Sequence, residues 1–397
     1  MPVWHDITAQ AREDDELVVL GVIQEQHPER CVLFADWKGF DWPIVWDPFN
    51  LTGSRVVPGA FAIDEYGVLR SGNLRPDRLG PDFLDQTFEE PLDVSPRWSW
   101  PIEVDDGPLA SILFADAGAA RDAALAGHLP ALAARAAAHP EDGPARFQLG
   151  VAHRMRYDGA RGEPGDFQAA LDAWAAALAI DPNQYIWRRR IQQYGPRMDK
   201  PYPFYSWVDQ AVADLEARDG ETPDWIAELT AAERAEPRRG LPSVQSSGEA
   251  PDPDGLIQRD ADWMALETAV AFDTSSGTPV ARVHVELRPA PGAEAHWNNE
   301  VEPMKVWIDA PEGWQVDQSL REWPAVEAEI SDEVRRLEFE VVGPEAGAGN
   351  ATGDVAGDDT GTTTLHGYAL FHACQDRDGV CVYLRKDFEV ALRPPTD

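Results

Sequence analysis

The sequence has little lysine, little cysteine and no long apolar run. Only four of its 34 basic residues are lysines, against 70 acidic residues, and the formal net charge is -36. A field of that sign repels phosphate backbones and anionic lipid surfaces, so we expect neither nucleic acid nor a membrane surface as a partner. Because no apolar run approaches the roughly 18 residues of a membrane span, we expect no membrane insertion.

The first residues do not have the pattern of a secretory signal. MPVWHDITAQAREDDELVVL contains neither a basic n-region nor an uninterrupted apolar segment. As written, the sequence predicts a cytoplasmic protein. Its three cysteines, Cys31, Cys374 and Cys381, cannot all pair within one chain, which excludes a disulfide scaffold.

The composition indicates a multidomain α+β protein. A chain of 397 residues that is 43% hydrophobic, with 15 Trp and 14 Phe, has material for several cores. The pattern divides into an α/β region (1–100), an alanine-rich helical region (115–236), a Pro/Ser/Gly-rich linker (237–255) and a strand-rich region (256–397). Regularly spaced turns in the last region favour an antiparallel β-sandwich.

Local patterns predict individual elements in the first two regions. We expect strands at 17–23, 42–47 and 60–64, with a helix at 27–40 between the first two. The turn Asp64-Glu65-Tyr66-Gly67 before VLR predicts a hairpin. In the helical region, segments 145–158 and 166–180 have helical spacing of apolar residues and predict a helical hairpin, which Asp181-Pro182 ends.

Two further segments differ from their surroundings. Residues 343–361 are rich in Gly, Ala and Asp, with no large apolar residue beyond Val355, and predict a mobile surface loop. Residues 185–208 are aromatic and locally basic. Their arginines, such as Arg190, would either bind an anion or dock within the molecule, and the acidic charge of the rest of the chain favours docking.

The paired cysteines stand on either side of an acidic, glycine-containing turn. Counting by twos, His372 and Cys374 share one face of their strand, and Cys381 and Tyr383 share one face of the next. Both cysteines can therefore face the same, less buried side of a sheet. Neighbouring antiparallel strands bring Cα atoms to about 4.5–5.5 Å, which suits a disulfide.

Three chemical roles remain open for this pair. Thiol–disulfide exchange needs a thiolate, which His372, Arg377, Arg385 and Lys386 would favour and Asp376 and Asp378 would oppose. The alternatives are an inert structural disulfide and metal binding with His366 or His372. The remaining cysteine, Cys31, is lone and predicted to belong to a core. The scattered histidines suggest no triad and no metal spacing, and we expect no cofactor.

The carboxy-terminal region resembles the amino-terminal, immunoglobulin-like domain of the thiol:disulfide interchange protein DsbD. The matching stretches are PGAEAHWNN (291–299), IDAPEGW (308–314) and the cysteine hairpin HACQDRDGVCVYLRKDFEV (372–390). In that family two hairpin cysteines exchange a disulfide with partner proteins. The resemblance implies that Cys374 and Cys381 are catalytic, with a thiol- or disulfide-bearing protein as partner.

The amino-terminal region resembles a thioredoxin-like fold of the redoxin type. VVPGAFAID (56–64) carries the match. The resemblance implies a cis peptide at Val57-Pro58. The first strand and C-x-x-C turn of that fold do not precede residues 3–15, so either the domain is degenerate or the true start lies upstream of Met1. A signal upstream would give a periplasmic or secreted protein.

The helical region resembles a tetratricopeptide repeat at a few positions. These are Leu149, Gly150, Tyr157, Ala170, Trp174 and Pro182. One repeat is convincing and about three are needed for an array, so we interpret the region as a spacer. The whole chain is then either a thiol–disulfide oxidoreductase or a non-catalytic protein-interaction scaffold.

Overall fold

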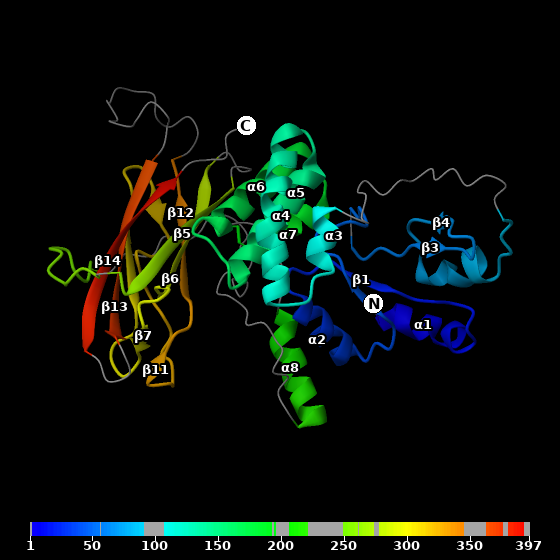
Figure 1. The fold of residues 1–397 in the computed structure, drawn as a ribbon, viewed down its shortest axis with the longest axis horizontal. Coiled ribbons are helices and arrows are strands. Elements are labelled where there is room, and N and C mark those ends of the chain that lie inside the picture. Colours follow the sequence, from blue (N-terminus) through cyan, green and yellow to red (C-terminus); the bar gives the residue numbers. More distant parts are fainter. Residues whose placement is uncertain are drawn as a thin grey trace. The chain divides into compact units, whose positions relative to one another are not determined.

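The structure combines helices with mainly antiparallel sheets (Figure 1), as the multidomain α+β class predicts. It is a computed structural model that describes residues 2–55, 57–90, 107–192, 194–195, 206–220, 249–260, 262–273, 278–344, 363–375 and 380–392. These residues form two compact units. The first contains the described residues of 2–162, 176–190 and 206–220, and the second those of 163–175, 191–195 and 249–392.

The first unit begins with a β-α-β segment. Helix α1 (Pro2–Glu13) precedes β1 (Gly21–Ile23), α2 (Pro28–Lys38) and β2 (Ile44–Trp46), and the two strands are parallel. The strand predicted at 17–23 is shorter than expected. Pro43 has no N–H to extend the pairing beyond Gly21, and Val18 is 83% exposed.

A hairpin follows, as the sequence predicts. Strands β3 (Ala62–Ile63) and β4 (Leu69–Ser71) pair antiparallel, and the Asp64 carboxylate accepts hydrogen bonds from the backbone of Tyr66 and Val68 in the turn. The Val57-Pro58 peptide is cis, as predicted. Among the described residues, β3–β4 and β1–β2 form two separate two-stranded sheets. Two short helical turns, η1 (Pro76–Arg78) and η2 (Gly80–Leu84), follow the hairpin.

The helical region contains the predicted helical hairpin. The described helices are α3 (Pro108–Leu113), α4 (Ala119–Ala138), α5 (Gly143–Asp158), α6 (Asp166–Ile180), α7 (Tyr185–Gln192) and α8 (Ser206–Asp219). Asp142 caps α5 by accepting the Ala145 N–H. A Cβ at Gly143 would lie 3.6 Å from Ile180, so the start of α5 meets the end of α6.

Arg190 confirms that the basic segment docks within the molecule. Its side chain is buried and donates to the backbone oxygens of Gln24, at 2.9 Å, and Pro48, at 3.4 Å. These carbonyls follow β1 and β2, so the arginine ties α7 to the end of the parallel strand pair. Arg197 and Lys200 of the same segment lie outside the described residues.

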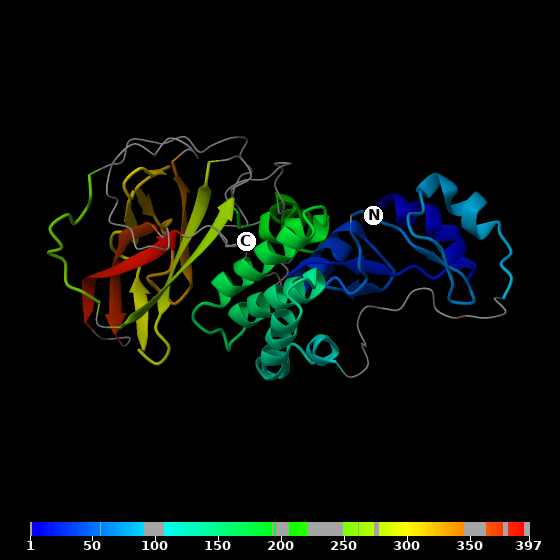
Figure 2. The same ribbon diagram turned by 90° about the horizontal axis from the view of Figure 1, so that it is seen from above.

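Two antiparallel sheets enclose the largest core. One sheet has the order β5 (Met264–Asp273), β6 (Val280–Pro289), β12 (Arg335–Val342) and β9 (Gln315–Val316). The other has the order β10 (Leu320–Glu322), β8 (Lys305–Asp309), β13 (Thr363–Gln375), β7 (Ala295–Asn298) and β11 (Ile330–Ser331), with β14 (Cys381–Leu392) also paired to β13. In Figure 2 the strands of both sheets are drawn from yellow-green (β5) to red (β14). Val283, Phe339, Trp297 and Phe371 meet between them.

The outer face of β6 and β12 carries a buried ladder of charged pairs. In register, Arg282 lies opposite Glu340, His284 opposite Glu338 and Glu286 opposite Arg336. The Arg282–Glu340 ion pair measures 2.6 Å and the Arg336–Glu286 pair 2.5 Å. Since buried charges are costly unless paired, each cross-strand partner offsets the desolvation of the other.

Residues from the helical region cover this ladder within the second unit. The Phe167 ring stands edge-on to His284 at 5.2 Å, and the Tyr194 carbonyl lies 3.0 Å from His284 Nε2. Gln168 pairs with the backbone of Val270 in both directions, donating at 3.2 Å and accepting at 2.7 Å. The side-chain amide thereby satisfies the edge of β5 as a neighbouring strand would.

The predicted loop at 343–361 lies almost wholly outside the described residues, which end at Pro344 and resume at Thr363.

Gly367 gives a test of packing in the centre of β13. A Cβ there would lie 2.5 Å from the Phe388 ring and 2.7 Å from the Trp307 carbonyl oxygen. We expect Gly367→Ala to lower the free energy of unfolding by about 1–3 kcal/mol, through overpacking. Gly72→Ala is the control, because nothing lies within 4 Å of that position. Urea unfolding of both variants checks the prediction; equal stability would contradict it.

The charged ladder gives a second test. Arg282→Leu leaves the buried Glu340 carboxylate without its guanidinium and should cost about 3–5 kcal/mol. Arg282→Leu combined with Glu340→Leu should recover most of that loss, because neither charge then remains to be desolvated. Thermal and urea unfolding of the single and double variants measure the difference. A double variant no more stable than the single one would show that the pair is not the source of the cost.

Candidate functional site

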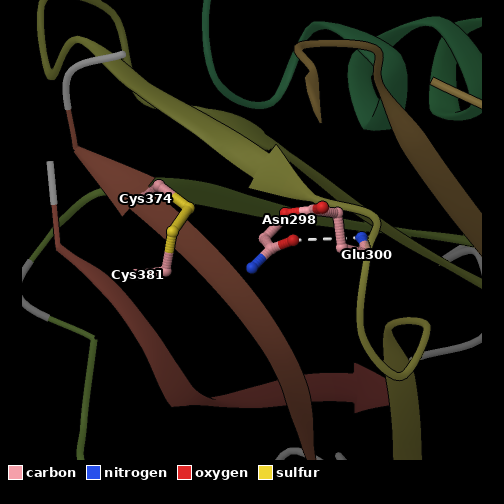
Figure 3. Close-up of a disulfide and its surroundings, with 4 residues drawn as sticks. All are labelled: Asn298, Glu300, Cys374 and Cys381. Carbon is pink, nitrogen blue, oxygen red and sulfur yellow. Dashed lines mark hydrogen bonds between the residues drawn. A yellow bond between two sulfur atoms is a disulfide. The ribbon is translucent and has the colours of Figure 1, made fainter. Parts of the chain in front are cut away.

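The two hairpin cysteines form a disulfide across β13 and β14. Cys374 and Cys381 are directly opposite in the antiparallel register, with an S–S distance of 1.96 Å and a Cα–Cα distance of 4.0 Å. Figure 3 shows the bond spanning the two strands. The prediction that they lie on facing strands within disulfide reach is confirmed.

The predicted division of faces is also confirmed. Tyr368 and Leu370 belong to a cluster on the outer face, whereas Phe371 and Leu384 belong to the core between the sheets. The outer face is more buried than expected at one cysteine. Cys374 is only 3% exposed, while Cys381 is exposed. The two sulfur-bearing residues therefore differ in their access to solvent.

A segment that the sequence assigned partly to a linker covers this outer face. Residues 249–260 lie across it, and Ala250 and Ile257 pack against the cluster. The buried Asp252 donates its N–H to the Tyr368 hydroxyl and accepts a hydrogen bond from Arg385 at 2.8 Å. The described end of the predicted linker is thus part of the folded unit.

The predicted cationic neighbours have carboxylate partners instead. Arg385 pairs with Asp252 and with Asp387, each at 2.8 Å. Lys386 pairs with Asp260 at 2.9 Å. Their positive charges are therefore largely neutralised by these carboxylates. Arg377, Asp376 and Asp378, which the sequence also placed near the cysteines, lie outside the described residues.

His372 lies two residues before Cys374, opposite Tyr383 in the register of β13 and β14. It stacks on Tyr383, with ring centroids 4.4 Å apart. Burial lowers the pKa of His372, with a further lowering from Lys305 and an opposing effect from Glu302. Burial likewise raises the pKa of Tyr383. At neutral pH the imidazole is neutral, so it is suited to exchange a proton with a nearby thiol rather than to act as a fixed cation.

The other side of Cys374 is formed by β7. His296 lies opposite Cys374 in the register of β13 and β7. Asn298, at the end of β7, accepts the Glu300 N–H through its side-chain oxygen at 3.0 Å (Figure 3). This hydrogen bond closes the turn at which β7 ends.

The metal-binding alternative finds no support in the described geometry. His366 is exposed and lies 3.3 Å from Glu389. It precedes Cys374 by eight residues on the same strand, which is about 26 Å and too far for His366 to join the cysteines. Within the described ranges there is no group of three or more His, Cys, Asp or Glu side chains that could hold a metal ion.

Cys31 is a core residue, as predicted. It is buried in α2 and is a free thiol. Burial, with smaller contributions from Glu25 and Glu29, raises the pKa of Cys31 to about 12. Such a thiol stays protonated at neutral pH, which makes it a poor nucleophile.

Comparison with known proteins leaves the family open. No protein-family model matches the chain, and no curated protein matches it in sequence. Among solved structures, a crystal structure of the yeast GGA1 GAE domain shares 11% identity, covering 35% of this chain and 97% of that chain, with a TM-score of 0.19. That likeness carries no argument here. None of the described helices has the length and apolar character needed to cross a membrane.

Two features of the site were not predicted from the sequence. The contact of His372 with Tyr383 follows from the register that pairs Cys374 with Cys381, because the preceding pair on the same face is His372 with Tyr383. Counting outward from the cysteines would have found it. The packing of residues 249–260 on the outer face of β13 and β14 cannot be predicted from a local sequence pattern, since it depends on contacts between segments far apart in the chain.

The pKa of His372 provides a test of this environment. Because burial lowers that pKa in the folded protein, protonation is resisted there but not in the unfolded chain. Stability should therefore fall as pH drops below the unfolded value of about 6.5. In His372→Gln that part of the pH dependence should be absent. NMR titration and urea unfolding at several pH values measure both effects; titration of His372 above the ordinary value would contradict the assignment.

Proposed function

We propose that the Cys374–Cys381 disulfide undergoes thiol–disulfide exchange with a thiol-bearing protein. The observation that carries the proposal is the unequal exposure of the two cysteines. Cys381 is open to an incoming thiolate, whereas Cys374 is 3% exposed and is shielded from external thiols. Attack at one defined sulfur is what an exchange site requires.

The exchange balances in two steps. A partner thiolate attacks Sγ of Cys381, a new S–S bond forms between partner and Cys381, and the bonding electron pair leaves on Sγ of Cys374. A second partner thiolate then attacks the partner's own sulfur in the mixed disulfide and releases Cys381 as a thiolate. The partner dithiol is oxidised to a disulfide, and the protein's disulfide is reduced. The reverse sequence would reduce a partner.

Three features support the direct participation of this pair. The cysteines are directly opposite on paired strands, so the bond can open and close without a change of register. His372 lies on the same face, two residues from Cys374, and its lowered pKa favours the neutral ring, which can accept a proton from a thiol and later return it. The hairpin also carries the resemblance to the DsbD amino-terminal domain, which favours an immunoglobulin-like assignment for residues 256–397.

The proposed exchange has a consequence for the compartment in which the protein works, and the first unit has features that agree with a redox-related fold. A disulfide that cycles with proteins fits an oxidising compartment such as the periplasm better than the cytoplasm. The β-α-β segment and the later β3–β4 hairpin support a thioredoxin-like assignment for the amino-terminal region.

A non-catalytic interaction scaffold is the second candidate. The carboxylate partners of Arg385 and Lys386 favour it, because they neutralise the cations that would have promoted a thiolate. In that case the disulfide is an inert staple. A reduction potential below about -300 mV would indicate such a staple, since that bond resists cellular thiols.

Variants that lack one of the two hairpin cysteines test which sulfur is open to exchange. In Cys374→Ser the exposed Cys381 should accumulate a mixed disulfide with glutathione from a glutathione redox buffer. In Cys381→Ser the buried Cys374 should react at least about tenfold more slowly, because it is shielded. Mass spectrometry of the intact protein measures both, with Cys31→Ser as the control that retains the disulfide. The double variant should fold but not exchange. Failure of Cys381 to form the mixed disulfide would contradict the proposal.

A further inference from the structure

We propose that the free edge of β14 at Cys381 and Tyr383 binds an extended segment of the partner protein. The segment adds to the sheet as a parallel strand and places its cysteine opposite Cys381. This inference rests on the proposed function, because it states how the partner of that exchange is recognised.

The hydrogen bonds of Arg385 show toward which side of β14 its backbone N–H and C=O groups point. Its N–H donates to the Gln258 carbonyl, and its own carbonyl accepts the Asp260 N–H, each at 2.8 Å. The backbone groups of Arg385 therefore point away from β13. Along an antiparallel strand the N–H and C=O groups of successive residues point to opposite sides. The backbone groups of Tyr383 and Cys381, two and four residues before Arg385, therefore also point away from β13.

Among the described residues, these two positions have no backbone partner on the side of β14 that faces away from β13. Throughout the described ranges, β14 pairs with β13 and, at Arg385, with residues 258–260, while no backbone group outside β13 bonds to the backbone of Cys381 or Tyr383. An edge with unpaired N–H and C=O groups is a template for a further strand.

A strand of this chain already occupies the same edge farther along. Arg259 pairs in parallel with Arg385. The edge of β14 can therefore accept a parallel neighbour, and the partner segment would continue that line of pairing toward Cys381.

The direction of the disulfide makes this edge the place from which a thiolate must come. The bond runs from Cys374 on β13 to Cys381 on β14 (Figure 3). Attack at a disulfide sulfur occurs in line with the bond that breaks. The line from Cys374 through Cys381 leads away from β13, toward the free edge. A residue opposite Cys381 on an added strand lies about 5 Å away, within the range of a mixed disulfide.

The surroundings of the edge indicate the chemistry of the segment. Val380, directly before Cys381, is 72% exposed. Leu256 is 84% exposed, and it directly precedes Ile257, which packs against the same outer-face cluster as Tyr383. The chain as a whole carries a net charge of -36. The segment that fits is extended, has apolar or β-branched residues around its cysteine, and lacks acidic residues.

Two isomeric peptides test the proposal on the oxidised full-length protein. Both contain one cysteine flanked by Val and Thr, and each carries one N-methyl group. In the first, the methyl is on the amide of the residue after cysteine, which faces β14 in the parallel register. In the second, it is on the amide of the cysteine itself, which faces away. The unmethylated peptide and glutathione serve as references, and the rate of mixed-disulfide formation at Cys381 is measured by mass spectrometry.

The first peptide should react at least about tenfold more slowly than the second, because it loses a backbone hydrogen bond and gains a steric clash with β14. The second should match the unmethylated peptide. Equal rates for the two isomers, with glutathione still reacting, would overturn strand addition and leave the proposed exchange intact. The reverse order would overturn the parallel register. No reaction with any thiol, glutathione included, would overturn the proposed function itself.

Discussion

The pairing of β13 with β14 is the constraint on which the rest of the second unit depends. Its register sets Phe371 and Leu384 against the opposite sheet and, on the other face, brings Cys374 to Cys381. Because side chains alternate with a period of two, a slip by one residue would expose Phe371 and turn Cys374 toward the core. The same pairing therefore specifies both the core and the disulfide, and burial of the apolar face protects the position of the cysteines.

Counting by twos was enough to predict the two faces of this hairpin, and helical spacing was enough for α5 and α6. Both signals are local. The sequence was less informative where distant segments decide the result. The burial of Cys374 depends on the packing of β7 and the neighbouring strands, and the pairing of Arg385 depends on Asp252, which the composition assigned to a linker. The strand at 17–23 is short because its neighbour begins after Pro43.

The charged ladder on β6 and β12 is a second case in which a local sequence pattern does not predict burial. The alternation of Arg282, His284 and Glu286 with apolar residues is typical of a strand with one solvated face. In the structure that face is buried beneath residues that include Phe167 and Tyr194. Polar alternation is therefore a sign of the strand but not of its exposure. Cross-strand charge pairing, with each cation opposite an anion, is the feature that separates a buried polar face from a solvated one.

The position of the disulfide favours the proposed exchange over a structural staple. It closes a sequence separation of 7 residues, and cross-linking a short loop restricts the unfolded chain less than cross-linking a long one. The strands that it joins are already held in register by core residues from Leu365 to Leu392. Opening the bond therefore removes little that keeps β13 and β14 together. A disulfide whose two sulfurs stay adjacent after reduction can close again without refolding, which is the condition for repeated exchange at a single site.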